Sequence, residues 1–220
     1  MPRLLIADDH PLFRLALAQA VREVMPGARV LEADTLEAAR TILSSDADID
    51  LLLLDLHMPG NRGLLGLVAL RAEFPAVAVV MISANDDPLV IRRALAYGAA
   101  GYIPKRADLE AIKRGLKAVL DCAEYVPDGL RAAVYADADG GSADRELAPR
   151  LASLTPQQLR VLVLVAEGRL NKQIADHLGI QERTVKAHLT SIFEKLGVRN
   201  RTQASALLHH LEIADPVRRL

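Results

Sequence analysis

Cysteine is almost absent from this chain of 220 residues, in which Cys122 is the single thiol. One cysteine excludes an internal disulfide and a multi-cysteine metal site, and it is most simply explained as a helix residue in a reducing compartment. Tryptophan is missing and aromatic residues make up only 3% of the chain, whereas 51% of the residues are hydrophobic. A core made mostly of Leu, Ala, Val and Ile suits helices packed on a parallel sheet.

Long hydrophobic runs are also missing. The chain has no uncharged apolar stretch of about 18 residues, the minimum for a helix that spans a membrane. The N-terminus becomes acidic at Asp8 and Asp9, which is too early for a signal peptide. These absences predict a cytoplasmic protein without a membrane partner.

Charge is unevenly distributed, although the net charge is only −1. Residues 1–125 carry 14 Lys and Arg against 17 Asp and Glu, and residues 126–150 carry 3 against 5. Residues 151–220 carry 10 against 6, so the last segment alone is basic, as in a nucleic-acid-binding module. Ordinary solvated surfaces differ by as much, so this asymmetry only supports other evidence.

The first 120 residues alternate short apolar runs with helical patterns. Five runs predict strands: Arg3–Ala7, Arg29–Ala33, Ile49–Leu54, Val77–Ile82 and Gly101–Ile103. Helical patterns lie near residues 11–25, 35–45, 63–73, 87–97 and 107–121. This alternation predicts an α/β fold with a five-stranded, doubly wound parallel sheet. In such a sheet the functional site lies at the carboxyl ends of the strands.

Strand signals stop after residue 125. The acidic stretch Ala136–Ser142 contains two glycines and predicts a flexible linker. Four short helices are predicted beyond it, near residues 156–167, 171–178, 182–196 and 201–211, so this part should be all-α. The predicted organisation is a domain of residues 1–122, a linker of residues 123–150 and a second domain of residues 151–220.

Polar residues stand at four of the predicted strand ends. Asp8 and Asp9 follow the first strand, Asp55 the third, Ser83 the fourth and Lys105 the fifth. Carboxylates that share a pocket raise one another's pKa unless a cation joins them, and Mg²⁺ prefers such oxygen ligands. A carboxylate beside that ion could attack a phosphoryl donor, while lysine and serine neutralise and hydrogen-bond the transferred group. Each residue alone has an ordinary structural explanation, and only their joint placement favours this chemistry.

Four segments at these strand ends form a specific combination: Asp8-Asp9-His10, Asp55-Leu56-His57-Met58-Pro59-Gly60, Ser83-Ala84 and Tyr102-Ile103-Pro104-Lys105. Over residues 1–122 they resemble the receiver domain of bacterial response regulators, whose sheet is flavodoxin-like. The resemblance implies that Asp55 is the phosphoacceptor. It also implies that Asp9 binds Mg²⁺ directly and Asp8 through water, with the backbone carbonyl of His57 completing the ligands. Ser83 and Tyr102 match a switch pair that rearranges on phosphorylation.

The C-terminal third has a helix, a short turn and a second helix. Thr155 and Pro156 are typical of a helix start, and Gly179 is typical of a tight turn. Beyond it, one apolar face repeats at 4-3-4 spacing, at Val185, Leu189, Ile192 and Leu196. This is the outline of a helix-turn-helix, although the periodicity alone fits an ordinary small bundle equally well.

Three strings here are more specific: Asn171-Lys172-Gln173-Ile174-Ala175, Glu182-Arg183-Thr184-Val185-Lys186-Ala187-His188 and Lys195-Leu196-Gly197-Val198-Arg199-Asn200-Arg201-Thr202. Over residues 151–211 they resemble the LuxR-type helix-turn-helix, and the whole chain is similar to response regulators of the NarL/FixJ class. The resemblance places Lys186, Ala187 and Thr190 nearest the DNA bases. It implies contacts to phosphates, which position a protein without reading sequence, from four further residues: Thr155, Thr184, Lys172 and Lys195.

The same resemblance implies how such a chain works. A sensor histidine kinase would phosphorylate Asp55, and the protein would then bind promoter DNA as a homodimer, with the recognition helix masked in the inactive form. The helix around Ala204–Leu211 is the expected dimer contact. We expect no enzymatic activity beyond the receiver's promotion of its own phosphotransfer and dephosphorylation.

The chain departs from its class at two positions of one helix. Response regulators of this class usually carry glutamates in the first helix of the DNA-binding domain, where this chain has Gln158 and Arg160.

The same residues also bear on other functions. A phosphatase of the haloacid-dehalogenase type would need a second aspartate where His57 stands. A Rossmann nucleotide enzyme would need glycines after the first strand. A DNA-binding protein of the same two domains that is never phosphorylated stays possible.

Overall fold

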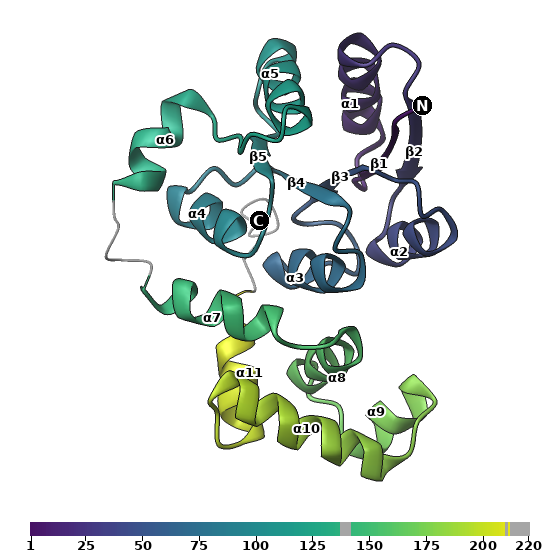
Figure 1. Ribbon diagram of the computed structural model, residues 1–220, viewed down its shortest axis with the longest axis vertical. Helices are drawn as coiled ribbons and strands as arrows, with labels where there is room; N and C mark the ends of the chain where they lie inside the picture. Colours follow the sequence, from purple (N-terminus) through teal and green to yellow (C-terminus); the bar gives the residue numbers. More distant parts are fainter. Residues whose placement is uncertain (137–141, 210, 212–220) are drawn as a thin grey trace.

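The computed structural model describes residues 1–136, 142–209 and 211. Figure 1 shows a sheet flanked by helices, with a second, all-helical group packed beside it. The two parts correspond to the predicted α/β and all-α segments.

The sheet contains five parallel strands in the order β2-β1-β3-β4-β5. Their bounds are β1 (Arg3–Ala7), β2 (Arg29–Ala33), β3 (Leu51–Asp55), β4 (Ala78–Ser83) and β5 (Gly101–Pro104). This order is the flavodoxin-like one. Every residue of β3 is buried, as expected for an apolar strand covered on both faces. The predicted fold class is therefore confirmed.

Helices cover both faces of the sheet. One face is packed by α1 (Pro11–Val24) and α5 (Leu109–Leu120), and the other by α2 (Leu36–Ser45), α3 (Leu64–Glu73) and α4 (Pro88–Ala96). The bounds of α5 differ slightly from the prediction, because Asp108 caps the helix by accepting a hydrogen bond from the Ala111 N–H at 2.7 Å. A helix begins where its capping group stands, which periodicity alone does not locate.

The segment interpreted as a linker holds two helices that the sequence analysis did not predict. They are α6 (Asp128–Tyr135) and α7 (Ser142–Ala152). Each has a narrow apolar side, with Val134 buried in α6 and Leu147 and Leu151 buried in α7. The acidic, glycine-containing composition obscured these few apolar positions. Most of the predicted flexible stretch Ala136–Ser142 lies outside the described residues.

The C-terminal part contains α8 (Pro156–Ala166), α9 (Asn171–Leu178), α10 (Glu182–Leu196) and α11 (Arg201–His209), as predicted. Gly179 ends α9 with φ +65°, a left-handed conformation that glycine adopts without a steric cost. The predicted apolar face of α10 is buried at all four positions. These helices form the expected helix-turn-helix.

The two parts are joined by apolar packing and by polar contacts. One buried hydrophobic cluster extends from the sheet to Leu211, and α3 packs against α7 and α8. Arg160 of α8 reaches Glu73 at the end of α3, with Nε 3.0 Å from Oε1. Glu73 also lies 3.4 Å from Nε of Arg40, and its side chain is only 6% exposed. Arg160, one of the two departures from the class, therefore serves the domain contact.

This ion pair yields a test of how the parts are held together. Arg160→Glu should place two carboxylates against each other and disfavour the docked arrangement by about 1 kcal/mol, or roughly fivefold, since Arg160 is half exposed. Small-angle X-ray scattering of the full chain should show a larger radius of gyration. Arg199→Glu, the same charge change on an exposed residue outside these contacts, is the control. Identical scattering from both variants would mean that apolar packing alone fixes the arrangement.

Candidate functional site

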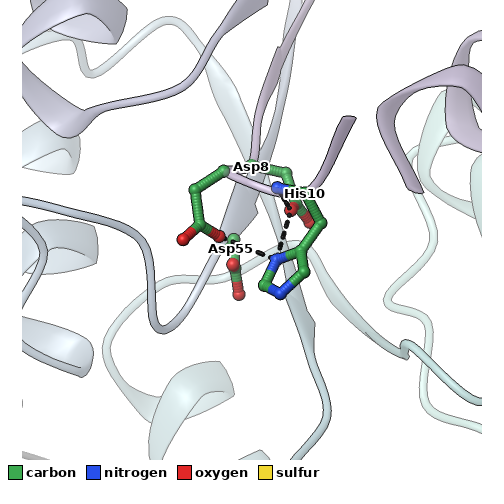
Figure 2. Close-up of side chains that lie close together, drawn as sticks. Asp8, His10 and Asp55 are labelled. Carbon is green, nitrogen blue, oxygen red and sulfur yellow. Dashed lines mark hydrogen bonds and ion pairs between the residues drawn. The ribbon is translucent and has the colours of Figure 1, made fainter. Parts of the chain in front are cut away.

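The carboxyl ends of β1, β3 and β5 bring three charged side chains into one cleft. Nζ of Lys105 lies 2.8 Å from Oδ2 of Asp8 and 2.9 Å from Oδ2 of Asp55. Asp8 and Asp55 are each 1% exposed. Figure 2 shows the side chains of Asp8, His10 and Asp55 close together at this edge of the sheet. The predicted convergence of the strand ends is confirmed.

His10 joins the cleft, although the sequence analysis assigned it no role. Its Nδ1 lies 2.7 Å from Oδ1 of Asp9, 3.2 Å from Oδ1 of Asp8 and 3.2 Å from Nζ of Lys105. Its backbone N–H also donates to Asp8 at 2.8 Å. Direct adjacency to the Asp8-Asp9 pair was the signal that could have identified it, because the chain turns there into α1.

The cleft has the properties of a cation site. One ligand atom from each of Asp8, Asp9, His10 and Asp55 lies within 4.8 Å of the others. Oδ2 of Asp8 and Oδ1 of Asp9 are both buried, with Nζ of Lys105 2.8 Å from the first and Nδ1 of His10 2.7 Å from the second. Three carboxylates face a single lysine there. Their oxygen atoms and excess negative charge fit a divalent cation.

Burial and charge oppose each other at Asp55. Burial and the neighbouring charge of Asp8 raise the pKa of its carboxyl group, while Lys105 and the backbone N–H of His57 act in the opposite direction. Burial alone would lower the pKa of Lys105, yet its hydrogen bonds to Asp8 and Asp55 raise it on balance. The lysine is therefore charged at neutral pH, and its hydrogen bond is the largest influence that lowers the pKa of Asp55.

The loop after β3 is fixed by contacts that the sequence analysis missed. Nδ2 of Asn61 donates to the carbonyl oxygens of Asp55 at 2.9 Å and Leu56 at 3.2 Å. The backbone N–H of His57 donates to Oδ1 of Asp55 at 3.1 Å. Gly66 makes room for Asn61, since a Cβ at that position would lie 2.1 Å from Oδ1 of Asn61. No local pattern reveals these contacts, because the partners are set by the path of the loop.

The predicted switch pair meets at one loop. Ser83 and Tyr102 are both fully buried. Oγ of Ser83 accepts a hydrogen bond from the Asn85 N–H at 3.0 Å, and the Tyr102 hydroxyl donates to the Asn85 carbonyl. Burial raises the pKa of Tyr102, so its hydroxyl stays a donor at neutral pH. The side chain of Tyr102 is thus turned into the fold in this structure.

Helix α4 connects this loop to α7. Its first turn is capped by Asp87, which accepts from the Leu89 N–H at 2.8 Å. At the other end of α4, Nε of Arg93 and the Tyr97 hydroxyl donate hydrogen bonds to the buried carboxylate of Asp144 in α7, at 2.8 Å and 2.9 Å. The two ends of α4 therefore contact the switch loop and the segment that leads to the C-terminal part.

The residues expected nearest the bases lie on an open face. Lys186, Ala187 and Thr190 are exposed on α10, and Thr184 is half-buried. Nζ of Lys186 lies 2.9 Å from Oε1 of Glu182, one turn earlier. Figure 1 places α8 between α3 and α10, so the recognition helix lies on the side away from the sheet. The masked form expected for the inactive state is not the arrangement seen here.

Two of the four expected phosphate contacts have partners inside the domain. The hydroxyl of Thr155 caps α8 by accepting from the Gln158 N–H at 3.2 Å. Nζ of Lys195 donates to the Ser153 carbonyl at 2.7 Å and to Oε1 of Gln158 at 2.8 Å. Lys172, in contrast, is exposed in the first turn of α9. The sequence alone could not separate these roles, because they depend on the neighbouring helix.

Two family models match the chain. The response regulator receiver domain covers residues 4–117, and the luxR family of bacterial regulatory proteins covers residues 152–208. The chain therefore belongs to the response regulators, with a receiver domain followed by a LuxR-type DNA-binding domain.

Its relatives are of the NarL/NarP type. The chain is 42% identical over 206 residues to the glycerol metabolism activator of Pseudomonas putida and 35% identical over 209 residues to the nitrate/nitrite response regulator protein NarP of Escherichia coli K12. Each alignment covers 93% of this chain and 93% of the relative. The Salmonella typhimurium response regulator RcsB has the same fold, with a TM-score of 0.57 and 24% identity over 96% of this chain and 100% of that one. Among the described residues, no helix is both long and apolar enough to cross a membrane.

The buried charge of Asp55 predicts a pH-dependent gain in stability for Asp55→Asn. Since burial raises the pKa of Asp55 above 3.8, the folded protein binds that proton more tightly than the unfolded chain, and stability is lost as the pH rises through this window. Removing the charge should stabilise the fold by about 0.5–2 kcal/mol at pH 7.

Thermal unfolding in a chelator, measured from neutral to acidic pH, tests this expectation. The difference from the unsubstituted protein should shrink as the pH falls and both states become protonated. Asp121→Asn, which removes an exposed carboxylate, should change stability less. A lower midpoint for Asp55→Asn at pH 7 would contradict the electrostatic account of the cleft.

Proposed function

We propose that this response regulator is switched by phosphorylation of Asp55 by a sensor histidine kinase and then binds promoter DNA as a homodimer. The observation that carries this proposal is the convergence of Asp8, Asp55 and Lys105 on one buried cleft. An ordinary surface ion pair would not bury three charged groups with a net negative charge, because burial of charge is costly.

The residues of the cleft have complementary roles in the proposed transfer. A carboxylate oxygen of Asp55 forms a bond to phosphorus while the bond from phosphorus to the donor breaks, and the bonding electrons leave with the donor. Lys105 stabilises the negative oxygens of the phosphoryl group, and the hydroxyl of Ser83 donates a hydrogen bond to one of them. For Ser83 this requires its hydroxyl to turn from the Asn85 loop toward Asp55.

The cation of this site is proposed to be Mg²⁺. Asp9 and Asp55 would hold it directly, Asp8 through water, and the backbone carbonyl of His57 would complete the protein ligands. When bound, the ion offsets the charge of the carboxylates and of the phosphoryl oxygens. A phosphatase that hydrolyses an aspartyl phosphate would need an aspartate as general acid at the position of His57. The receiver is therefore proposed to promote only its own phosphorylation and dephosphorylation.

The proposed domain organisation retains the bounds of residues 1–122 and 151–220, with residues 123–150 as a partly helical connection. The protein is proposed to act in the cytoplasm, where promoter DNA is located. A solved structure of two RcsB dimers bound to two parallel DNAs supports a dimeric DNA complex here. Ala204, Leu208 and Leu211 are buried within the fold, so any dimer contact by this helix must use its outer side.

Phosphorylation provides the direct test of the Asp55 assignment. A small-molecule phosphodonor with Mg²⁺ should label the unsubstituted protein and Asp121→Asn equally, whereas Asp55→Asn should remain at background. Chelation of the metal should abolish labelling, because the donor and the cleft are both anionic. Equal labelling of Asp55→Asn would refute the assignment while leaving the DNA-binding proposal intact.

DNA contacts are tested by comparing two lysines. Lys186→Ala should weaken binding to a target promoter by about 1–3 kcal/mol and relax its sequence preference, if Lys186 contacts a base edge. Lys172→Ala should weaken binding similarly for all sequences and reduce the salt dependence, as expected for a phosphate contact. Fluorescence anisotropy on target and mixed-sequence duplexes at several salt concentrations distinguishes the two. A uniform loss for both variants would remove Lys186 from the base-reading set.

A further inference from the structure

Gln158 is a buried polar residue that joins two helices of the DNA-binding domain. It is 7% exposed. Its Oε1 accepts hydrogen bonds from the Thr155 N–H at 3.0 Å and from Nζ of Lys195 at 2.8 Å, and its Nε2 donates to Oγ of Ser191 at 3.0 Å. One side chain thus ties the first turn of α8 to two positions of the recognition helix α10.

Lys195 keeps an uncompensated charge in this arrangement. Both of its acceptors, the Ser153 carbonyl and Oε1 of Gln158, are neutral. Within the part of the chain that the structure describes, no carboxylate forms an ion pair with it. The first turn of α8 beside it also lacks an acidic residue. An ammonium group has three N–H donors, so one remains for an outside acceptor.

The amide of Gln158 is not required by the helix cap. The capping box at Thr155 needs a side-chain oxygen at the third helical position, which glutamate supplies as well as glutamine. The two residues have nearly the same shape, and they differ in charge. A glutamate here would bring a carboxylate against Nζ of Lys195 and neutralise it. The departure from the class at this position therefore changes the electrostatics while the cap stays possible, and with glutamate the Ser191 hydroxyl would donate to the carboxylate instead of accepting from Nε2.

We propose that Gln158 is a positioning residue for DNA binding, which holds Lys195 in place beside α8 and leaves its full charge for one DNA phosphate per subunit. This inference rests on the proposed DNA-binding function and adds to it the residue that sets the strength of one backbone contact. It accounts for a lysine that has internal hydrogen bonds and still serves as a phosphate ligand.

The test is the salt dependence of DNA affinity for full-length Gln158→Glu. Each lost phosphate contact should reduce the slope of log K against log[salt] by about 0.9, which corresponds to roughly eightfold in affinity at ~0.1 M salt per subunit. A mixed-sequence duplex with phosphodonor present suffices, because a phosphate contact is independent of sequence. The unfolding midpoint of Gln158→Glu should not fall, since the cap is kept and both Lys195 and the Ser191 hydroxyl can donate to the new carboxylate.

Two further variants separate this role from a structural one. Gln157→Glu introduces the same charge one residue away, without contacting Lys195, and should change the slope less. In a Lys195→Met background, Gln158→Glu should have no further effect on the slope, since the partner charge is gone. If Gln157→Glu reduces the slope of log K against log[salt] as much as Gln158→Glu does, the effect comes from the overall electrostatic field of the domain, and the proposal fails.

The failure of this inference can be told from failure of the proposed function. An unsubstituted protein that binds DNA with a normal salt dependence, together with an unchanged slope for Gln158→Glu, overturns only the role of Gln158. An unsubstituted protein that does not bind any duplex overturns the DNA-binding function itself, and this inference with it.

Discussion

A lysine held between two buried carboxylates is the interaction on which the rest of this structure depends. Lys105, Asp8 and Asp55 come from three strands that are not consecutive in the chain, so only a parallel sheet of this order brings them together. Taking charges out of water is costly, and these side chains have one positive charge for two negative ones. The cleft therefore carries excess negative charge that a bound cation would offset, while the surrounding apolar sheet holds its side chains in place.

The elements that leave the cleft are the ones that contact the C-terminal part. The segment after Asp55 leads into α3, and the last residue of this helix, Glu73, forms an ion pair with Arg160 of α8. The segment after Ser83 leads into α4, where Arg93 in the last turn donates a hydrogen bond to Asp144 of α7. Both contacts pair a carboxylate that is largely buried, so a small movement of either helix alters a well-defined hydrogen bond. The two segments that leave the cleft therefore both end at the interface between the two parts.

The sequence predicted what depends on local pattern and on the rule for parallel sheets. The strand ends at Asp8, Asp55 and Lys105 could be located because each follows an apolar run, and parallel strands gather such ends at one edge. Asn61, which pins the loop after β3, could not be predicted, since its acceptors are backbone carbonyls chosen by the fold. The same holds for Lys195, whose partners lie in the first turn of α8 and in the short connection before that helix.

The open face of α10 constrains how phosphorylation can control DNA binding. Here the two parts are docked through α3, α7 and α8, and yet Lys186 and Ala187 are exposed. Docking in this arrangement and access to DNA are therefore compatible. A modification shifts an equilibrium only by stabilising one state more than another. Under the proposed function, phosphorylation would then act by favouring a state that brings two such faces together, because paired half-sites require paired helices.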